Sequence, residues 1–202
     1  ITGGLRFDYE QKELLVHGDY QKDGEQAFVI QPDTTASVDF NAVSPHIGLS
    51  YFPSASTQVF ITYSRGFRTG GLTQLSQDPS QPPLYPYQPE YSNTVEAGIK
   101  NSLLNNKLTL NASAFYTYVR DVQVPTLVLP DAITITKNTG KLTATGLELQ
   151  LAAAPAKGLQ IDYNFGYTHA IYNSLKIAQN GETVNLDDKK QLFTPDITNM
   201  LA

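Results

Sequence analysis

The sequence predicts an all-β protein whose antiparallel, up-and-down strands form a segment of a transmembrane β-barrel. Apolar and polar residues alternate along successive stretches, as they do in strands with one apolar face. The connections between these stretches are alternately short and long. Outer-membrane barrels have this rhythm, with short turns at one end and long loops at the other. No run of about 18 apolar residues is present, so we expect no transmembrane helix.

The clearest alternation lies in a predicted hairpin from Glu90 to Asp121. One face of its return arm carries Leu108, Leu110, Ala112, Ala114, Tyr116 and Tyr118. The other face is polar except for Phe115, which interrupts the pattern. Further strands are expected at 1–9, 40–52, 57–67, 138–153 and 159–172, with a last one beginning near Pro195. The prediction is therefore about eight strands.

The connections define the expected organisation. Short turns are expected at 53–56, 101–107 and 154–158, facing the periplasm. Long outer loops are expected at 10–39, 68–89, 121–137 and 173–194, with pairing possible from Ile133 to Ile135. The prolines of 68–89 argue against regular pairing there. Because the chain begins and ends inside apparent strands, we expect 1–202 to be a partial barrel truncated at both ends.

Periodicity alone leaves two directions open for the apolar face. In a membrane barrel it points to lipid and the polar face lines the interior. The aromatic girdles would then include Tyr51, Tyr116, Tyr118, Tyr167 and Tyr172. In the alternative, a small adhesion or ligand-binding barrel or a soluble β-sandwich, the same residues pack inward. Direct pairing of the first and last strands would favour the small closed barrel.

Composition argues against several functions. The net charge is -5 without a block of Lys or Arg, which gives nucleic-acid binding little support. The chain has no cysteine, and therefore neither disulfides nor thiolate chemistry. His17, His46 and His169 show no metal-ligand spacing, so we expect no metal site, and no cofactor.

A hydrolase is the third alternative. It would require His169, Ser174 and Asp162 to meet in one place. His169 has the phase of Tyr167, which is expected to face lipid. We therefore expect no enzyme.

Four groups of residues, taken in order, carry a resemblance. They are Ser64-Arg65-Gly66-Phe67-Arg68-Thr69-Gly70-Gly71; Pro89-Glu90 followed by Glu96-Ala97-Gly98-Ile99-Lys100; Phe115-Tyr116 followed by Asp121-Val122-Gln123; and Asn138-Thr139-Gly140 followed by Gly146-Leu147-Glu148-Leu149. Their order and spacing resemble the barrel of TonB-dependent outer-membrane receptors, over roughly Phe40 to Tyr172.

The resemblance implies a 22-stranded barrel in the outer membrane of a Gram-negative bacterium, in contact with its lipid. Such a barrel is plugged by an N-terminal domain and imports ferric siderophores, cobalamin, haem or some glycans. TonB supplies the energy through a short box on the receptor. The plug, the box and the final aromatic-ended strand have no counterpart in these residues, so the transport function is expected to belong to a longer parent.

The candidate ligand-binding residues are Arg65 and Arg68, as a fork for an anionic siderophore, and Tyr85 and Tyr87, as stacking platforms. The simpler role for both pairs is to anchor or pack the outer loop. The residues expected to line the interior are Glu96, Lys100, Glu148, Gln150 and Asp162. These five would contact the plug or hydrate the lumen.

Overall fold

The computed structural model describes residues 1–20, 23–24, 28–74, 84–128, 133–179 and 182–202. The strands within these ranges are β1 (Thr2–Tyr20), β2 (Phe28–Ser54), β3 (Thr57–Arg68), β4 (Gly71–Gln74), β5 (Leu84–Tyr87), β6 (Glu90–Leu103), β7 (Leu108–Val128), β8 (Ile133–Ala156), β9 (Leu159–Gln179), β10 (Glu182–Asn185) and β11 (Ile197–Leu201). No helix that could cross a membrane occurs in these ranges.

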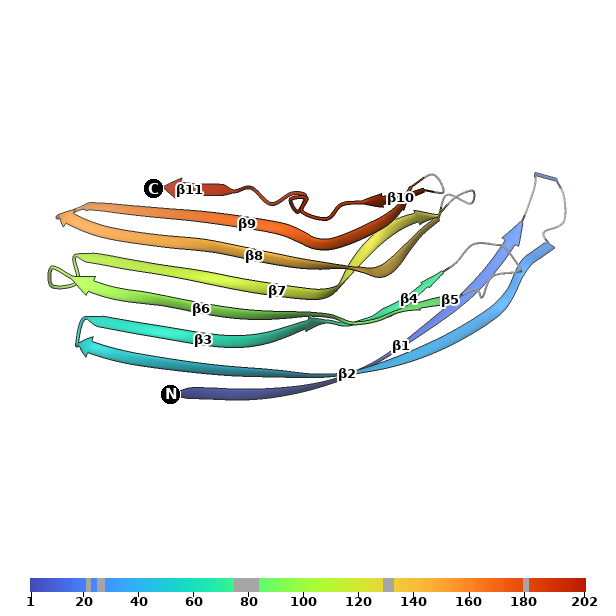
Figure 1. The fold of residues 1–202 in the computed structure, drawn as a ribbon, viewed down its shortest axis with the longest axis horizontal. Helices are drawn as coiled ribbons and strands as arrows, with labels where there is room; N and C mark the ends of the chain where they lie inside the picture. The colour runs from blue at the N-terminus through green and yellow to red at the C-terminus, as the bar shows by residue number, and fades with distance from the viewer. Residues whose placement is uncertain (21–22, 25–27, 75–83, 129–132, 180–181) are drawn as a thin grey trace.

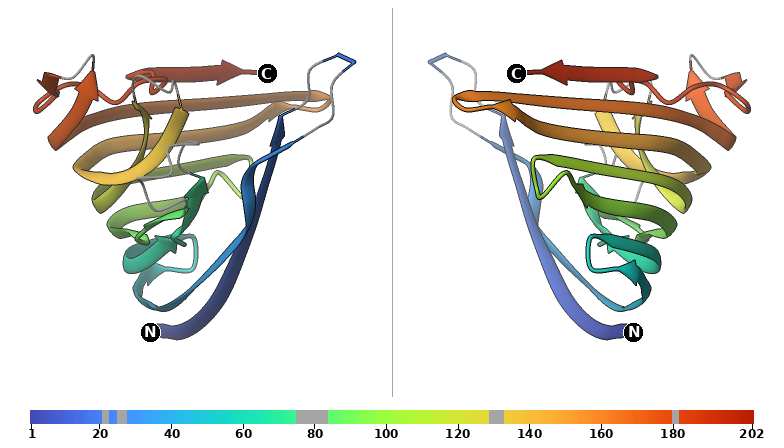
Figure 2. Two further views of the ribbon diagram at one scale, coloured as in Figure 1. Left: turned by 90° about the vertical axis from the view of Figure 1, so that its right-hand side faces the viewer. Right: turned by 90° about the vertical axis from the view of Figure 1, so that its left-hand side faces the viewer.

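The long strands form one antiparallel sheet in the order β1-β2-β3-β6-β7-β8-β9-β10, and β11 also pairs with β9 (Figure 1). The β2–β3, β6–β7 and β8–β9 turns lie at one end of the strands, the turn end, and the opposite end is the loop end. Figure 2 shows that the sheet curves into an open trough. The predicted all-β, up-and-down class is confirmed. Within the described ranges β1 and β11 do not pair, so the alternative of a small closed barrel is wrong.

The register joins residues of the same phase into rows across the sheet. One row contains Leu49, Ile61, Ala97, Ala114, Leu147, Tyr167 and Ile197. These residues lie on the convex face, where the side chains of Ile61, Tyr116 and Leu147 are 47%, 49% and 54% exposed. The convex face is therefore apolar, and none of the described residues packs over these side chains.

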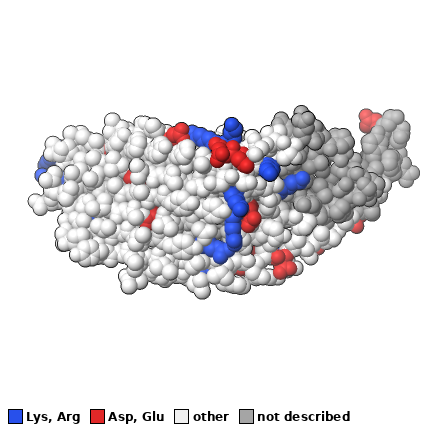
Figure 3. Space-filling model, viewed as in Figure 1, with Lys and Arg blue, Asp and Glu red and all other residues white. Residues whose placement is uncertain are grey.

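This arrangement contradicts the soluble β-sandwich, in which the same side chains would pack against a second sheet. Figure 3 shows the convex face as largely free of Lys, Arg, Asp and Glu toward the turn end, with its charges gathered toward the loop end. The most buried apolar side chains lie instead on the concave side toward the loop end: Val16, Phe40, Ala42, Leu142, Ala170 and Leu175. The molecule thus has its apolar surface outside and only a small apolar core inside.

The structure corrects the extent of three expected loops. β1 continues to Tyr20 and β2 begins at Phe28, so most of 10–39 is paired. β7 and β8 likewise pair through most of 121–137, and β9 and β10 through part of 173–194. These extensions carry charged residues such as Glu13 and Asp33 and lack a long apolar face. Charged residues and consecutive apolar ones, as at Leu14-Leu15-Val16, interrupt the hydrophobic alternation in these extensions, although the backbone pairing continues.

The expected loop at 68–89 also contains pairing, in the ribbon of β4 with β5. Pro86 lies opposite Leu72 in this ribbon. A proline is tolerated in an edge strand because its missing N–H is not needed by a further neighbour. The prediction that prolines prevent regular pairing here was therefore wrong.

Short turns join β2 to β3, β6 to β7 and β8 to β9. Asn105 and Asn106 have φ values of 56° and 64° in the turn before β7. Asparagine tolerates this left-handed region better than most residues because its short side chain can bond locally. Gly158, with φ of 82°, provides the same freedom before β9.

Two phenylalanines on the concave face lie over glycines of the next strand. Phe60 is opposite Gly98, and Phe115 is opposite Gly146. A Cβ atom added at Gly146 would stand 2.5 Å from Cζ of Phe115, and one at Gly98 would stand 2.7 Å from Cζ of Phe60. Phe115, the exception in the sequence pattern, therefore covers bare backbone on the polar side of the sheet.

We expect Gly146→Ala to destabilise the sheet by about 1–3 kcal/mol, because the new methyl group would clash with both the Phe115 ring and the backbone carbonyl oxygen of Tyr167. Urea unfolding, followed by the loss of β-sheet circular dichroism, measures the change. Gly4→Ala is the matched control, since nothing lies within 4 Å of a Cβ at Gly4. Equal stability of the two variants would contradict the role given to the ring.

Candidate functional site

The concave face forms a polar wall with a hollow of about 520 Å³ toward the turn end. Glu96, Lys100, Glu148 and Gln150 line this hollow, together with His46. Asp162 has the concave phase too, but it lies nearer the turn, where it accepts a 2.8 Å hydrogen bond from Gln160 Nε2. The wall can hydrate or hydrogen-bond a large polar object held inside the trough.

The β4–β5 ribbon lies across the concave side at the loop end. β4 contacts β1, β2 and β8, and β5 contacts β8. β2 and β8 are separated in the sheet by β3, β6 and β7, so an element that reaches both must bridge the trough. The ribbon is therefore positioned over the interior rather than extended away from the barrel wall.

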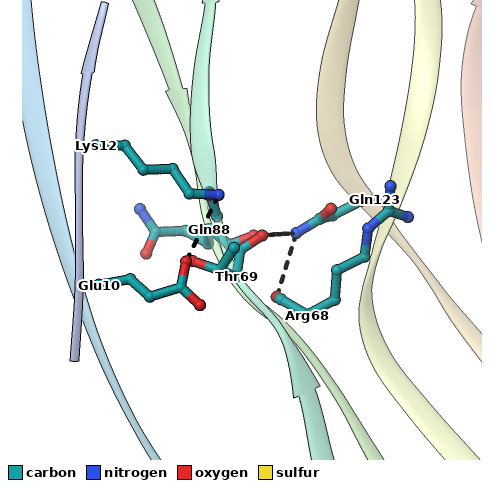
Figure 4. Close-up of polar contacts among 7 residues, drawn as sticks. Glu10, Lys12, Arg68, Thr69, Gln88 and Gln123 are labelled. Atoms are coloured by element: carbon teal, nitrogen blue, oxygen red, sulfur yellow. Dashed lines mark hydrogen bonds and ion pairs between the residues drawn. The ribbon is translucent and has the colours of Figure 1, made fainter. Parts of the chain in front are cut away.

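Gln123 of β7 binds the backbone just before β4, where the chain enters the ribbon (Figure 4). Its side-chain Nε2 donates to the carbonyl oxygens of Thr69 at 2.8 Å, Gln88 at 3.2 Å and Arg68 at 3.4 Å. Its backbone N–H donates to Oε2 of Glu90 at 2.8 Å. Gln123 is only 7% exposed, so these carbonyls have little access to water as a substitute partner.

Asn138 of β8 binds the backbone of Gln88, just after β5, where the chain leaves the ribbon. It lies opposite Gln123 in the register. Its Nδ2 donates to the carbonyl oxygens of Gln88 at 2.7 Å and Asp121 at 2.8 Å, and its Oδ1 accepts from the Gln88 N–H at 2.7 Å. Both amide hydrogens and the oxygen are thus used. We call Gln123 and Asn138 the amide clamp.

Residues of β1 and β2, on the other side of the trough, also contact the base of the ribbon. Lys12 Nζ of β1 donates to the Gly70 carbonyl at 2.8 Å. The same atom lies 3.9 Å from Oε2 of Glu10 (Figure 4). The Phe40 ring of β2 lies against Gly70, where an added Cβ would stand 2.5 Å from its Cζ. The base of the ribbon is therefore fixed by strands on both sides of it.

The clamp residues were not among the sequence candidates, although the signal for them was present. In the sequence, Asp121-Val122-Gln123, Asn138-Thr139-Gly140 and Pro89-Glu90 carry the family resemblance without showing that they meet. The structure brings all three strings together with the end of Ser64–Gly71. Their meeting depends on pairing between distant strands, which a pass along one sequence does not give.

The structure separates the predicted arginine fork. Arg65 and Arg68 are an odd number of positions apart in β3 and leave the sheet on opposite faces. Arg65 lies on the convex face, with its guanidinium carbon 4.5 Å from the centroid of the Tyr91 ring. Arg68 pairs with Glu90, and its side chain is exposed. The two residues therefore cannot grip one ligand inside the barrel.

The two tyrosine candidates both belong to β5. Tyr87 lies over Gly71 of the same ribbon, where a Cβ would stand 2.5 Å from the tyrosine hydroxyl. Its ring is thus packed on the ribbon backbone. The side chain of Tyr85 lies outside the described residues.

The hydrolase alternative requires His169 and Asp162 to meet, but their side chains leave the sheet on opposite faces. His169 is on the convex face opposite Thr145, whereas Asp162 is on the concave face. No cluster of His, Cys, Asp or Glu able to hold a metal ion occurs in the described part of the chain.

His17 makes the clearest electrostatic contact of the extended β1–β2 pair. Its Nδ1 lies 2.6 Å from Oδ1 of Asp33, and its Nε2 lies 3.0 Å from Oδ1 of Asp19. Hydrogen bonds to Asp19 and then Asp33 raise the pKa of His17 above its ordinary value of 6.5. A protonated imidazole can donate to both carboxylates at once.

Comparison with known proteins explains this architecture. Residues 1–198 match the family described as TonB dependent receptor-like, beta-barrel. The chain belongs to this family. TonB-dependent receptor barrels lie in the outer membrane of Gram-negative bacteria, so the apolar convex face of this barrel segment faces lipid and the predicted localisation is confirmed. The family is one of receptors, not of enzymes.

Individual relatives agree with the family. The metal-pseudopaline receptor CntO of Pseudomonas aeruginosa (strain UCBPP-PA14) is 23% identical over 188 residues, covering 91% of this chain and 24% of the relative. The ferric yersiniabactin uptake receptor FyuA of Yersinia pestis superposes with a TM-score of 0.74 at 20% identity, covering 98% of this chain and 27% of FyuA. The siderophore receptor PiuA of Acinetobacter baumannii gives a TM-score of 0.68 at 19% identity, with 98% and 27% covered. The chain thus spans about a quarter of the length of these receptors.

We expect Gln123→Leu to loosen the ribbon, because it leaves the carbonyl of Thr69 without its side-chain donor at a cost of about 1–3 kcal/mol. The carbonyl of Gln88 loses one of its two donors and keeps Asn138. Hydrogen exchange of the amides in Gly71–Gln74 and Leu84–Tyr87 should accelerate. Gln160→Leu, at the turn end, is the control and should leave that exchange unchanged. Unaltered exchange in both variants would show that Gln123 does not fix the position of the ribbon.

The raised pKa of His17 makes the contact pH-dependent. The stabilisation is fully present below the unfolded pKa of about 6.5 and is lost as the pH rises through the higher folded value. We expect the chemical shift of His17 to titrate above its ordinary range and to return toward it in Asp19→Asn/Asp33→Asn. Glu13→Gln, which removes the same kind of charge from β1, should have little effect. A wild-type midpoint at or below the ordinary value would disprove the contact.

Proposed function

We propose that this chain is part of the barrel wall of an outer-membrane importer that takes up a ferric siderophore or a similar metal complex with energy from TonB. The observation that carries the proposal is the β4–β5 ribbon held over the trough by the amide clamp. A ribbon fixed at the loop end narrows the entrance to a polar interior. Cobalamin, haem and glycans remain as other ligand classes for the test.

The polar wall supports the same proposal. Glu96, Lys100 and Glu148 place both signs of charge on one hollow, alongside the neutral Gln150. Lys100 Nζ also lies 5.3 Å from the centroid of the Phe60 ring, which orients it within the wall. A wall with charges of both signs suits a plug domain that binds inside the barrel and must later move, because many weak contacts are easier to break in turn than one strong contact. TonB and the plug would act in the full-length receptor.

Uptake by cells that carry the full-length receptor tests the proposal. We expect one of a panel of hydroxamate, catecholate and carboxylate siderophores loaded with ⁵⁵Fe to accumulate only when the receptor and TonB are both present. A protonophore should abolish accumulation while leaving surface binding intact. Receptor-dependent uptake of cobalamin, haem or a glycan instead would replace the ligand class, and no TonB-dependent uptake of any of these would refute the importer.

The contribution of the ribbon is tested with Gln123→Ala/Asn138→Ala. We expect lower uptake at an unchanged amount of receptor, because the entrance is no longer held in one shape. Gln160→Ala is the control and should transport like the wild type. Normal uptake by the clamp variant would show that the ribbon does not act in transport.

A further inference from the structure

The β1–β2 pair reaches beyond its neighbours at the loop end (Figure 1). Within the described residues β2 pairs with β3 only from His46 toward the turn, so the earlier part of β2 pairs with β1 alone. β4 contacts both strands, and Lys12 of β1 donates to the Gly70 carbonyl there. Farther out, the position of this hairpin depends chiefly on the pairing of its own two strands.

The backbone ladder of this hairpin is interrupted in its outer part. The register shifts at His17, where the opposite strand contributes both Pro32 and Asp33, and a second shift follows directly. Proline weakens the ladder further, because it has no N–H to donate. We call this interruption the joint, and the pairs beyond it, residues 18–20 with 28–31, the outer arm.

The side chain of His17 spans the joint. Its Nδ1 lies 2.6 Å from Oδ1 of Asp33 on β2, and its Nε2 lies 3.0 Å from Oδ1 of Asp19 in the outer arm. A neutral imidazole has one N–H and one bare nitrogen, so it can donate to only one of these carboxylates. The other carboxylate would then face a lone pair at hydrogen-bonding distance. The geometry therefore fits the protonated ring, which donates to both.

The proton on His17 supplies the positive charge at the joint. Among the described residues, Asp19 and Asp33 are the ionisable groups bonded to the ring. Glu13 shares the face of the ring but lies four residues nearer the turn end, and Lys12 belongs to the inner face. β4, which packs on that inner face, has no ionisable side chain. Loss of the proton therefore leaves two like charges on either side of a neutral ring, and like charges repel.

A small core beneath the joint limits how far an opening can spread. Val16, the residue before the ring, points to the concave side and is buried, as is Phe40 of β2. Phe40 also lies against Gly70 at the base of the ribbon. His17 is instead half-exposed and Asp33 largely exposed, so no packing holds the arm once these bonds are lost. Opening that begins in the arm is therefore expected to stop at Val16.

We propose that His17, Asp19 and Asp33 form a proton-operated clasp that sets the position of the outer arm relative to the barrel. The imidazolium bonds Asp19 of the arm and Asp33 of β2 at once and so connects the two strands across the joint. When the ring releases its proton to the surrounding water, one hydrogen bond is lost and the carboxylates repel. The arm then moves about the joint, while the β4–β5 ribbon keeps its place.

The direction of the switch follows from the pKa of His17, which hydrogen bonds to Asp19 and then Asp33 raise above 6.5. A raised folded pKa means that the clasp is fully closed below the unfolded pKa of about 6.5. It opens as the pH rises through the higher folded value. The outer arm is thus fixed in acid and released in alkali.

The test is hydrogen exchange of the full-length receptor in detergent, read by mass spectrometry at about pH 5.5 and about pH 8.5, on either side of the histidine titration. Rates are corrected for the intrinsic pH dependence of exchange. We expect the amides of 18–20 and 28–31 to be about two- to fivefold less protected at the higher pH, as suits an exposed charged contact. The amides of β4 should show no such difference.

Three variants separate the clasp from a general effect of pH. His17→Gln and Asp19→Asn/Asp33→Asn should remove the pH difference in the arm, because no imidazolium then joins two carboxylates. His169→Gln is the matched control, since it removes a histidine from the convex face of β9 and should keep the wild-type difference.

Three results would overturn the proposal: equal protection of the arm at both pH values in the wild type, a pH difference that survives in His17→Gln, or a difference that extends equally to β4. The last would place the motion in the whole loop end rather than at the joint. Asp33→Asn alone covers the case in which His17→Gln does not fold, because this carboxylate is largely exposed. It should reduce the pH difference, and an undiminished difference there would also refute the clasp.

Discussion

The alternation of side chains across an unbroken register is the constraint on which the rest of the molecule depends. From β3 to β9 the pairing runs without a shift through the apolar band, so each residue of one phase meets residues of the same phase on both sides. A single slip would move the apolar row of a strand to the trough and its polar row to lipid. Backbone groups in lipid have no other partners, so the register and the pairing stabilise each other.

The register shifts lie outside the apolar band, and those toward the loop end mark where the functional parts begin. Register shifts occur around Val122 in β7–β8, between Lys141 and Leu142 in β8–β9, and beside Gly18 in β1–β2. Asp121, at the first of them, has φ of 57°. Bulges re-aim side chains. Here the bulge separates Arg120, directed outward to Tyr91, from Gln123, directed inward to Thr69. A few residues of one strand thus contribute to both surfaces of the barrel.

The sequence was sufficient for those features that repeat along a strand. Alternation at Leu108–Tyr118 and the spacing of the short turns predicted the sheet and its directions, and the ordered strings predicted the family. It was insufficient in the extensions around Glu13 and Asp33, because charged residues and the consecutive apolar residues Leu14-Leu15-Val16 interrupt the alternation there. The clamp was missed because Gln123 and Gln88 become neighbours only through the order β3-β6-β7. Arg65 was assigned by its chemistry to a ligand, although its phase, shared with Ile61 and Tyr63, already directed it to the convex face.

The amide clamp on the concave side and the basic residues Arg65, Arg120 and Lys141 on the convex side interact through different forces. The amide clamp joins neutral side chains to backbone carbonyls, so the strength of its hydrogen bonds depends little on ionic strength or on pH near neutrality. The convex cations are exposed or half-buried point charges, whose attraction to an anion is weakened by salt. The base of the ribbon therefore combines the neutral amide clamp with one charged donor, Lys12, which lies beside Glu10. Salt weakens the attraction between Lys12 and Glu10 but leaves the amide hydrogen bonds in place, so the clamp keeps the ribbon over the trough when the ionic strength changes.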